Sequence, residues 1–496
     1  YNTGVITTSQ TTDIDGDIRC PGTGCPGGAS APDRGADEYW IPDNDIIPLT
    51  SGIVPCAGAQ NVQIYVSNAG LRTLTSFTVN WSVGGVAQTP LVVSSSNVAS
   101  GSDTLVNIGS HTFTQGTTYN FEYITSVPSG VADQQMFNDT LRESMQNAMS
   151  GTFSVGTPTA DYATFTDAVA DLKKNSLCGP VILELQDTTL SESFTIGDIG
   201  GVSSINTITI DQDPANAKPG ILDGKITLGD ISYLTVKNIV INTSGSAFEI
   251  ESGKMINNIK IDSNTFNLSG TSSSAFWDGH YAKNIDSLWF TNNEVNGGYY
   301  IMRIYGGSSN NKSSQESNIY IENNNMTGFL QYGLYVIYAN NIHIINNDVI
   351  SDPAYGSQPY GILAQYDMNL EISKNRIVAG GTTGGYGIYT YYTNRYGTTS
   401  DVLKINNNFI VAGRALNTST RIGIYMGYYD ERAEVYHNNV TILGSAGGTT
   451  EAMYTRYTRY SSFRNNIFQN TVGSTTWNEL SSTSVTKDYN AYWTGT

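Results

Sequence analysis

The sequence predicts an all-β protein in which a parallel β-helix follows an immunoglobulin-like β-sandwich. Three observations support this fold class. Aromatic residues make up 11% of the chain and charged residues only 14%, which is typical of packed β structure rather than disorder. Alternating apolar and polar residues with turn signals between them fill residues 44–149. An asparagine between apolar residues then recurs through the second half of the chain.

Length, charge and hydropathy limit the class of protein further. The 496 residues exceed one ordinary core, so we expect two or more domains. The net charge of −18 argues against nucleic acid as a partner, because a phosphate backbone needs a basic surface. No apolar run approaches the ~18 residues of a membrane span, so we expect no membrane insertion. The acidic balance predicts an extracellular or cell-surface protein.

Residues 1–43 form the first predicted segment and match neither of the two folds. Cys20 and Cys25 lie in the short loop CPGTGC, where we favour a disulfide over two free thiols, as expected in an exported protein. A metal site at these cysteines is disfavoured because no second Cys or His pair lies near.

An acidic pattern in the same segment resembles the start of a calcium loop. Asp13, Asp15 and Asp17 alternate, but such a loop needs a bidentate acid about twelve positions in, where Gly24 stands. The sequence therefore predicts no metal and no cofactor.

Residues 44–149 predict the β-sandwich, with Trp81 in its core. Only Cys56 falls in this stretch, so an antibody-type inter-sheet disulfide is excluded. Cys178 lies far away in the sequence, and the pairing of Cys56 and Cys178 stays open. The predicted strands are 61–68, 75–83, 103–109 and 118–126.

Residues 150–496 predict the β-helix, opened by an amphipathic helix over residues 161–178. Asp161 could cap this helix and Gly179 could end it. We expect the helix to cover the first coil, because solenoids need capped ends. Its apolar face comprises Tyr162, Phe165, Ala168, Val169 and Leu172.

A recurring asparagine frame defines the coils. Apolar residues lie five and three positions before the Asn and two after it, although the frame weakens at Asn438 and Asn466, where Ala433 and Ser461 stand five positions before. Successive Asn residues are 23 to 33 positions apart. This irregular period indicates a solenoid with rigid strands and variable loops. We expect the Asn to take left-handed backbone angles at a tight bend and to form a ladder from coil to coil. The Asn positions are Asn264, Asn293, Asn324, Asn347, Asn375, Asn408, Asn438 and Asn466.

The apolar positions of this frame predict the β-helix core, because alternation with polar residues buries one face of a strand. The residues expected to point inward are Ile259, Ile261, Ile319, Ile321, Ile342, Ile344, Ile372 and Ile405.

A second strand follows each Asn and reads YGLY, YGIL, YGIY, IGIY or AMYT. We identify Tyr335, Tyr389, Tyr425 and Tyr454, which close four of these strands, as candidate glycan-binding residues, because flat aromatic faces in a row suit sugar rings. The alternative is that these rings only stack on one another and stabilise neighbouring strands.

Three segments resemble parts of large exported proteins of Bacteroidota. TTDIDGDIR…APDRGADEY is similar to the closing segment of a right-handed, pectin-lyase-like β-helix domain, which implies that residues 1–43 close a preceding β-helix. NVQIYVSNAGLRTLTSFTVNWSVGGVAQTP resembles the immunoglobulin-like module that alternates with such domains, and residues 150–185 resemble the entry to the next one. The resemblance implies giant surface adhesins or surface fibres exported by type IX secretion.

The chain itself looks like one window from such an array. It opens with Tyr1 and carries no signal peptide, so we expect a removed signal or a piece of a longer protein. The resemblance implies a C-terminal secretion-signal domain, and its absence here also suggests a fragment.

Catalysis is the alternative function on this fold, as a polysaccharide lyase or glycoside hydrolase of the pectin-lyase-like type. Such enzymes gather acidic groups in neighbouring coils. The best candidates are Asp278 and His280 in WDGH with Asp286 nearby, but a paired Asp–Asp and a companion Arg-x-Lys are missing. The loop YYDER at 428–432 has the same shortcoming. We therefore predict that the chain is not an enzyme and has no catalytic residues.

The predicted function is a non-catalytic structural or adhesive segment of an extracellular fibre or adhesin. Its expected partners are neighbouring copies or adjacent repeats joined head to tail, together with surface polysaccharide.

Overall fold

The computed structural model describes residues 12, 42–53, 55–114, 117–186, 188–307, 312–414, 418–473 and 475–495. Strand accounts for 56% of the chain and helix for 4%, which confirms the predicted all-β class. The chain divides into two compact units, Tyr1–Ser150 and Gly151–Thr496. Almost all of the predicted closing segment 1–43, including the candidate disulfide Cys20–Cys25, lies outside the described residues.

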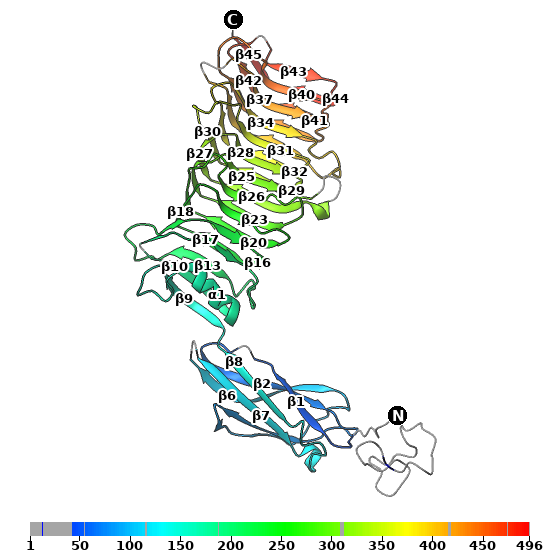
Figure 1. The fold of residues 1–496 in the computed structure, drawn as a ribbon. Coiled ribbons are helices and arrows are strands. Elements are labelled where there is room, and N and C mark those ends of the chain that lie inside the picture. Colours follow the sequence, from blue (N-terminus) through cyan, green and yellow to red (C-terminus); the bar gives the residue numbers. More distant parts are fainter. Residues whose placement is uncertain are drawn as a thin grey trace. The chain divides into compact units, whose positions relative to one another are not determined.

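The first unit contains two antiparallel sheets, as its alternating pattern predicts (Figure 1). The first sheet has the order β1 (Ile46–Ser51), β2 (Gly58–Asn68), β6 (Asp103–Phe113). The second has the order β4 (Val86–Ala87), β3 (Phe77–Val83), β7 (Thr118–Ser126), β8 (Thr140–Gln146), and β5 (Leu91–Val93) pairs with β3. The short 3₁₀ helix η2 (Pro128–Gly130) follows β7.

Trp81 lies in the core of this sandwich, as predicted. Its side chain is 5% exposed among residues such as Val79 and Tyr123. The indole Nε1 donates to the carbonyl oxygen of Thr89 at 3.0 Å, so the polar end of this large ring is satisfied.

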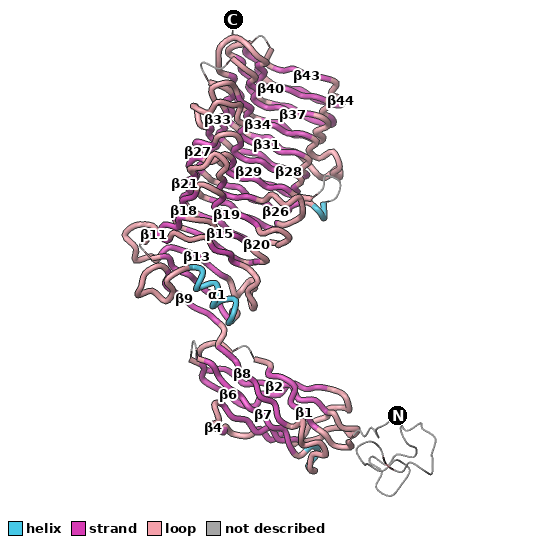
Figure 2. Tube along the Cα trace, viewed as in Figure 1, coloured by secondary structure: helices cyan, strands magenta, loops and turns pink. Residues whose placement is uncertain are grey.

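The second unit is a parallel β-helix of about 12 turns, built from three long parallel sheets (Figure 2). In the regular coils, a strand of sheet 1 is followed by one of sheet 2 and then one of sheet 3. The 3₁₀ helix η3 (Lys312–Ser314) lies in a loop between sheet 3 and sheet 1.

Sheet 1 consists of β9 (Met149–Val155), β10 (Leu177–Leu185), β13 (Ile208–Gln212), β16 (Ile231–Ser232), β17 (Leu234–Lys237), β20 (Ile256–Asp262), β23 (Ile285–Thr291), β26 (Glu316–Glu322), β29 (Ala339–Ile345), β32 (Met368–Ser373), β35 (Leu403–Asn406), β38 (Ala433–Tyr436), β41 (Arg459–Arg464) and β44 (Thr483–Asp488).

Sheet 2 consists of β11 (Thr189–Leu190), β14 (Ile221–Asp223), β18 (Val240–Thr243), β21 (Thr265–Leu268), β24 (Glu294–Gly297), β27 (Asn325–Phe329), β30 (Asp348–Ser351), β33 (Arg376–Ala379), β36 (Phe409–Ala412), β39 (Asn439–Ile442), β42 (Ile467–Asn470) and β45 (Ala491–Thr494).

Sheet 3 consists of β12 (Phe194–Ile196), β15 (Ile226–Leu228), β19 (Ser246–Ile250), β22 (Ser274–Trp277), β25 (Tyr300–Tyr305), β28 (Tyr332–Ile337), β31 (Tyr360–Gln365), β34 (Gly385–Tyr391), β37 (Arg421–Gly427), β40 (Thr450–Arg456) and β43 (Trp477–Leu480).

The isoleucines of the asparagine frame form the β-helix core. All eight isoleucines predicted to point inward are 0% exposed. They also align across sheet 1, where Ile319 pairs in register with Ile342 and Ile344 with Ile372. The spacing in the sequence therefore predicted both the buried face and the strand register.

The recurring asparagines form a hydrogen-bonded ladder, as predicted. The backbone N–H of Asn324 donates to Asn347 Oδ1 at 3.0 Å, and its Nδ2 donates to the same oxygen at 2.9 Å and to the carbonyl of Phe290 at 2.8 Å. The other seven predicted positions repeat this pattern, and Asn490 accepts from Asn466 as one further rung. These bonds satisfy amide groups that lie buried between coils.

The predicted position of the left-handed backbone was wrong by one residue. Positive φ values of 55–59° fall on the residue before each predicted ladder Asn. That preceding residue is exposed, whereas the Asn is only 1–2% exposed. The bend is thus made on the outside, and the next residue turns its amide inward to meet the neighbouring coil. The residues at the bend are Ser263, Asn292, Asn323, Asn346, Lys374, Asn407, His437 and Asn465.

The predicted capping helix is present but shorter than expected. It is α1 (Phe165–Asn175), and Figure 1 shows it at the β9 and β10 end of the β-helix. Thr164 is the N-cap and accepts from Asp167 N, whereas the expected cap, Asp161, accepts from Ser154 N at 2.8 Å. The C-cap is Ser176 rather than Gly179.

Most of the predicted apolar face of α1 is buried, but Tyr162 lies before the helix and is only partly buried. Phe165, Ala168, Val169 and Leu172 are buried, and the ring of Phe165 stacks on Phe194 of β12 with centroids 5.0 Å apart. The carboxylate of Glu192 accepts from Phe165 N at 2.7 Å, where an acidic group also suits the positive end of the helix dipole.

Cys56 in the first unit and Cys178 in β10 are each disulfide-bonded. Within the described residues, no helix has both the length and the apolar composition needed to cross a membrane.

Candidate binding surface

The outward face of sheet 3 carries the largest group of aromatic side chains in the described β-helix. We call it the tyrosine band and divide it into three columns that run from coil to coil. The first column consists of Tyr300, Tyr332, Tyr360 and Tyr386, which pair in register across β25, β28, β31 and β34.

The rings of the first column stack on one another. Centroid separations are 4.9 Å for Tyr300–Tyr332, 5.4 Å for Tyr332–Tyr360 and 4.6 Å for Tyr360–Tyr386. Interplanar angles are between 3° and 16°. This spacing follows from the distance of about 4.8 Å between neighbouring strands.

A glycine follows most tyrosines of this column because the position after the tyrosine faces inward and lies close to the backbone of the next coil. A Cβ on Gly361 would lie 2.6 Å from the carbonyl oxygen of Gly387. A side chain is therefore excluded, and the Tyr-Gly pairs of YGLY, YGIL and YGIY reflect an outward ring next to a close backbone contact.

The second column contains the four tyrosines predicted from the sequence. Tyr389 stacks on Tyr425 at 4.3 Å and 3°, and Tyr425 stacks on Tyr454 at 4.7 Å and 8°. Leu363 stands between Tyr335 and Tyr389 in the strand register. Tyr335 therefore joins the band through Tyr332 of the first column, at 5.0 Å.

The third column lies at the corner after sheet 3. Tyr338, Tyr366, Tyr392, Tyr428 and Tyr457 all have φ between 50° and 59°. Left-handed backbone costs roughly 1–3 kcal/mol for a residue other than glycine. Contacts of these rings must therefore offset that conformational cost at each of the five tyrosines. One such contact is the stack of Tyr366 on Tyr392, with centroids 5.0 Å apart.

Arginines lie over the rings along this corner. The guanidinium of Arg303 is 4.3 Å from the Trp277 ring, that of Arg395 is 4.4 Å from Tyr429, and that of Arg456 is 4.3 Å from Tyr428. Each such cation–π contact is worth about 0.5–2 kcal/mol. Within the described part of the chain, these three arginines have no carboxylate at ion-pair distance, unlike Arg459, which lies 3.8 Å from Glu431.

Three phenol hydroxyls of the band keep their protons. Burial, together with neighbouring tyrosines, raises the pKa of Tyr335, Tyr360 and Tyr425 to about 12. These groups therefore act as neutral hydrogen-bond donors and acceptors at any physiological pH.

The stacking decides which part of each ring a ligand can reach. A ring such as Tyr425 has a neighbour on both faces, so only its edge is open to a ligand. Sugar rings could not lie flat on the interior rings of the second column. The more exposed rings at the margins are Tyr281, Tyr396 and Tyr460, at 62%, 45% and 63% exposure.

The catalytic candidates occupy structural positions. Asp278 is 0% exposed and accepts from the backbone N–H groups of Tyr305 and His280. The Nε2 atom of His280 is 2.7 Å from the carbonyl oxygen of Ile250. Asp286 accepts from the hydroxyl of Ser317 at 2.8 Å.

Buried acids recur at the corner between sheet 3 and sheet 1. Asp367 and Asp430 are 0% exposed. Asp367 accepts from Ala339 N at 2.8 Å, and Asp430 accepts from Thr393 N and from Thr390 Oγ1, both at 2.7 Å. Asp430 also belongs to the YYDER loop, so that second catalytic candidate likewise serves the backbone of a corner.

The first tyrosine column and the arginines were not predicted from the sequence. The first column had a signal, since Tyr-Gly opens three successive strands. The arginines had no repeated signal, and the rings that they approach most closely belong to neighbouring coils, Tyr429 for Arg395 and Tyr428 for Arg456.

No protein-family model matches the chain, and no curated protein matches it. Two small solved structures match about a fifth of it. One is a cell-surface protein domain of Methanosarcina acetivorans, with 18% identity, 22% of this chain and 94% of that chain covered, and a TM-score of 0.19. The other is a CARDB domain of Pyrococcus furiosus in complex with di-metal ions, with 14% identity, 22% and 91% covered, and a TM-score of 0.18.

A longer match is the catalytic domain of a GH87 α-1,3-glucanase variant in complex with tetrasaccharides. It shows 9% identity, with 92% of this chain and 98% of that chain covered, and a TM-score of 0.24. Similarities at this level do not assign a function to this chain.

Proposed function

We propose that this chain is a non-catalytic, adhesive segment of an extracellular fibre or adhesin, and that the tyrosine band binds a glycan chain. The single observation that carries the proposal is the band itself, which extends over six strands of sheet 3 from β25 to β40. The sequence resemblance to type IX-secreted surface proteins of Bacteroidota supports the same assignment.

The extracellular location is supported by the disulfide state of the cysteines. Cys56 and Cys178 are both disulfide-bonded, and such bonds persist in oxidising compartments. The net charge of −18 and the small share of charged residues also suit a soluble, packed β protein outside the cell.

The chemistry of the band favours recognition of hydroxyl groups. Protonated phenols at roughly 4.8 Å intervals offer a row of donors and acceptors to a polymer lying along the β-helix. The strand ladder holds them in fixed positions, so little side-chain entropy is lost on binding. The guanidinium groups of Arg303, Arg395 and Arg456 add donors, which would favour glycans that carry carboxylate or sulfate groups.

The test is to measure binding of soluble neutral and acidic polysaccharides to the full chain. The triple variant Tyr389→Phe, Tyr425→Phe, Tyr454→Phe keeps the stacked rings and removes three hydroxyls. Each lost hydrogen bond is worth roughly 0.5–1.5 kcal/mol, so we expect affinity to fall about tenfold or more. The matched control is Tyr233→Phe, Tyr320→Phe, Tyr436→Phe, which removes three hydroxyls on or beside strands of sheet 1.

Equal affinity of both triple variants and the native chain would show that the band does not bind the glycan. If no polysaccharide binds the native chain, the stacked rings serve only the stability of the β-helix.

One observation favours the enzymatic alternative. Asp278 and Glu316 are both 0% exposed, and burial raises the pKa of Asp278 to about 6 and that of Glu316 to about 9. Raised carboxyl pKa values are a property of general acids. The two groups are, however, occupied by backbone N–H donors, with Glu316 accepting from Asn284 and Ile285.

A hydrolase or lyase would reveal itself by new reducing ends or unsaturated products from acidic or neutral polysaccharides. We expect none. Cleavage that disappears in Asp278→Asn or in His280→Ala would overturn the non-catalytic assignment.

The proposed partners include neighbouring copies or repeats joined head to tail. In the described last coil, Leu480, Tyr492 and Trp493 are 44%, 49% and 51% exposed, which leaves apolar surface for a following element. Light scattering of the full chain against a chain that begins at residue 44 would test whether residues 1–43 mediate this contact. Loss of association with both units still folded is the expected result.

A further inference from the structure

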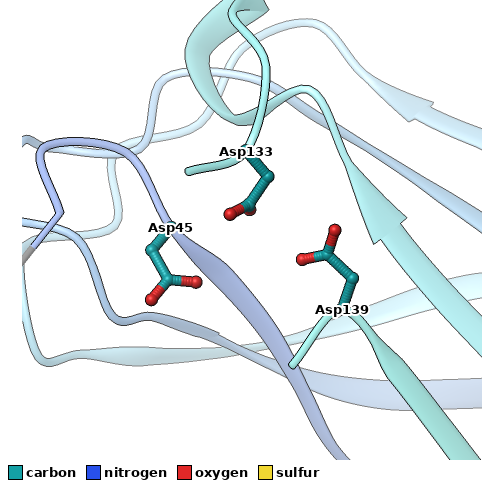
Figure 3. A group of neighbouring side chains, drawn as sticks. All are labelled: Asp45, Asp133 and Asp139. Carbon is teal, nitrogen blue, oxygen red and sulfur yellow. The ribbon is translucent and has the colours of Figure 1, made fainter. Parts of the chain in front are cut away.

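Three aspartates meet at one end of the sandwich although they come from distant parts of the sequence. Asp45 directly precedes β1, Asp133 follows η2, and Asp139 directly precedes β8. One carboxylate oxygen from each residue lies within 4.8 Å of the other two. Figure 3 shows the three carboxylates turned toward the space between them.

This group is buried and carries no balancing charge. Asp45, Asp133 and Asp139 are 2%, 9% and 8% exposed. In the part of the chain that the structure describes, no Lys, Arg or His forms an ion pair with any of them, and Arg72 pairs with Asp43 instead. Close, buried like charges are very unfavourable unless they are protonated or neutralised by a cation.

The hydrogen bonds around the group leave one carboxylate oxygen without a partner among the described residues. Asp133 accepts from Ile46 N at 2.9 Å and from Gln135 N at 2.8 Å. Asp45 accepts only longer bonds, of 3.2 and 3.3 Å, from Asn138 Nδ2. The Oδ1 atom of Asp139 is buried and has no partner among the described residues.

An unpartnered oxygen on a side chain that is more than nine-tenths buried is a costly feature. Figure 3 shows the carboxylate of Asp139 directed toward the other two. Asn138 Oδ1 is a second buried oxygen without a partner among the described residues, next to Asp139 in the sequence. Both observations indicate that something other than protein completes the site.

The backbone around the group is fixed, so its geometry is prearranged. Thr125 of β7 donates its hydroxyl to the carbonyl of Ile46 at 2.9 Å and its N–H to the carbonyl of Asp139 at 3.0 Å. Thr125 therefore holds both Ile46, which directly follows Asp45, and Asp139 itself. A site that is held before binding costs little ordering free energy when it is filled.

From this geometry we propose that Asp45, Asp133 and Asp139 bind a calcium ion. Calcium takes oxygen ligands at about 2.3–2.6 Å, so two oxygens on one ion lie at most about 5 Å apart, and three carboxylate oxygens that all lie within 4.8 Å of one another meet this limit. Magnesium demands a near-regular octahedron at about 2.1 Å and gives up its waters reluctantly, so a cluster of three protein carboxylates suits it less well. Zinc is disfavoured because the group has no sulfur or imidazole ligand.

The ion would fasten the loop between η2 and β8 to the start of β1. That loop exposes Met136 and Phe137, which are 75% and 85% exposed, between the two aspartates that it contributes. Without the ion, repulsion between the carboxylates opposes the folded position of the loop; with it, the same carboxylates hold the loop in place.

The experiment is calcium titration of the full chain after removal of divalent ions with a chelator, by calorimetry and by thermal unfolding. Extracellular calcium modules bind with Kd values of about 0.1–1 mM. At a concentration about 100 times the Kd, we expect the sandwich transition to rise by roughly 10 °C or more. Magnesium should bind at least about tenfold more weakly.

The diagnostic variant is Asp139→Asn, which keeps the shape of a side chain that accepts no hydrogen bond at Oδ1. In chelator, this variant should be as stable as the native chain or more so, because one repelling charge is gone. In calcium it should lose most of the rise in Tm. A purely structural carboxylate would show neither behaviour.

Two controls complete the design. Asp103→Asn removes an exposed acid at the start of β6 and should leave the calcium response unchanged. If Asp139→Asn folds poorly, Asp133→Asn takes its place and should likewise abolish the calcium response. Absence of calcium heat and of any shift in Tm in the native chain up to about 10 mM would overturn the proposal, as would an unchanged response in both site variants.

Discussion

In the β-helix a buried polar side chain meets its own counterpart in the next coil, whereas in the sandwich three buried aspartates from distant parts of the sequence lie beside one another without a balancing charge in the described part of the chain. Asn375, for example, both donates to Asn408 and accepts from Asn347. Asp139 has a buried oxygen with no partner among the described residues. A repeated coil therefore supplies partners automatically, and a sandwich must obtain them from residues far away in the sequence or from a ligand.

The same contrast applies to the apolar cores. In the sandwich, one cluster that includes Val79 and Trp81 unites both sheets. In the β-helix, each coil packs mainly on its two neighbours, so stability is close to a sum over coils. Damage to a core residue should consequently spread through the whole sandwich but stay local in the β-helix.

The largest expected effect tests this difference directly. Ile344→Asp places a charge at a 0% exposed position of β29 and should cost about 5 kcal/mol or more. Hydrogen exchange measured by mass spectrometry should show lost protection in a few coils around β29. The matched change in the sandwich, Val79→Asp, should remove protection from all of its strands. Uniform loss throughout the β-helix would contradict the nearest-neighbour description.

A smaller effect is expected from a break in the asparagine ladder. Asn375→Ala leaves the carbonyl of Ile344 and the N–H of Asn347 without their side-chain partner, at a cost of about 3 kcal/mol. Asn490→Ala at the partly exposed end of the ladder should cost about 1 kcal/mol. Chemical unfolding of the two variants gives the comparison, and equal costs would mean that the ladder does not stabilise the interior coils.

The buried corner acids predict a pH effect of about 2 kcal/mol. Burial raises the pKa of Asp430 from 3.8 in the unfolded chain to about 7. Between about pH 4 and 7 the folded protein keeps a proton that the unfolded chain has released, and this proton binding stabilises the fold. The stabilisation decreases as the pH rises and is lost as the pH passes through 7. Between pH 5 and 7.5 the native β-helix should lose about 2 kcal/mol more than Asp430→Asn.

The midpoint of unfolding of the β-helix transition at the two pH values measures this loss. Asp367 faces the same region and also carries a raised pKa through burial, so it remains as a background in both proteins. An identical pH response of the native chain and Asp430→Asn would show that Asp430 stays ionised when buried.

The smallest effect is expected on the exposed faces. Arg376 forms a two-bond ion pair with Asp348 on sheet 2, with side chains that are 51% and 39% exposed. Arg376→Ala should cost less than about 1 kcal/mol, because solvent screens exposed pairs. Arg142→Ala, which breaks the exposed pair with Glu122 in the sandwich, should cost as little. A large loss in only one unit would show that its surface contributes to its fold.

Much of the β-helix could be predicted because its information is local and repeated. A frame of eight residues around Asn347 gives the buried isoleucines, the ladder and the register of sheet 1. The error at the bend also has a local reason. Asn tolerates left-handed angles, but the ladder needs its amide inward, so the exposed residue before it, such as Lys374, takes the strained angle.

The ends of α1 were misplaced because several residues could cap it. Asp161 and Thr164 are both good N-caps in sequence, and only the tertiary contact of Asp161 with Ser154 decides between them. The first tyrosine column was overlooked although its Tyr-Gly pairs repeat as regularly as the ladder.

The aspartate site could not be found in the sequence. Asp45 lies 88 residues before Asp133 and 94 before Asp139, and no repeat marks any of the three. Only the closure of the sandwich brings β1 and the segment before β8 together. The arginines of the tyrosine band were not predicted for a related reason, since each contacts a ring from another coil.

The asparagine ladder also gives the β-helix a direction. Every rung donates its backbone N–H and one Nδ2–H to the Oδ1 of the next Asn on the C-terminal side, and its own Oδ1 accepts from the N-terminal side, as at Asn293, Asn324 and Asn347. Two such ends of the same kind would set donor against donor. A twofold-symmetric dimer through the ladder is therefore disfavoured, whereas translation along the axis places each acceptor beside a donor and allows open-ended growth.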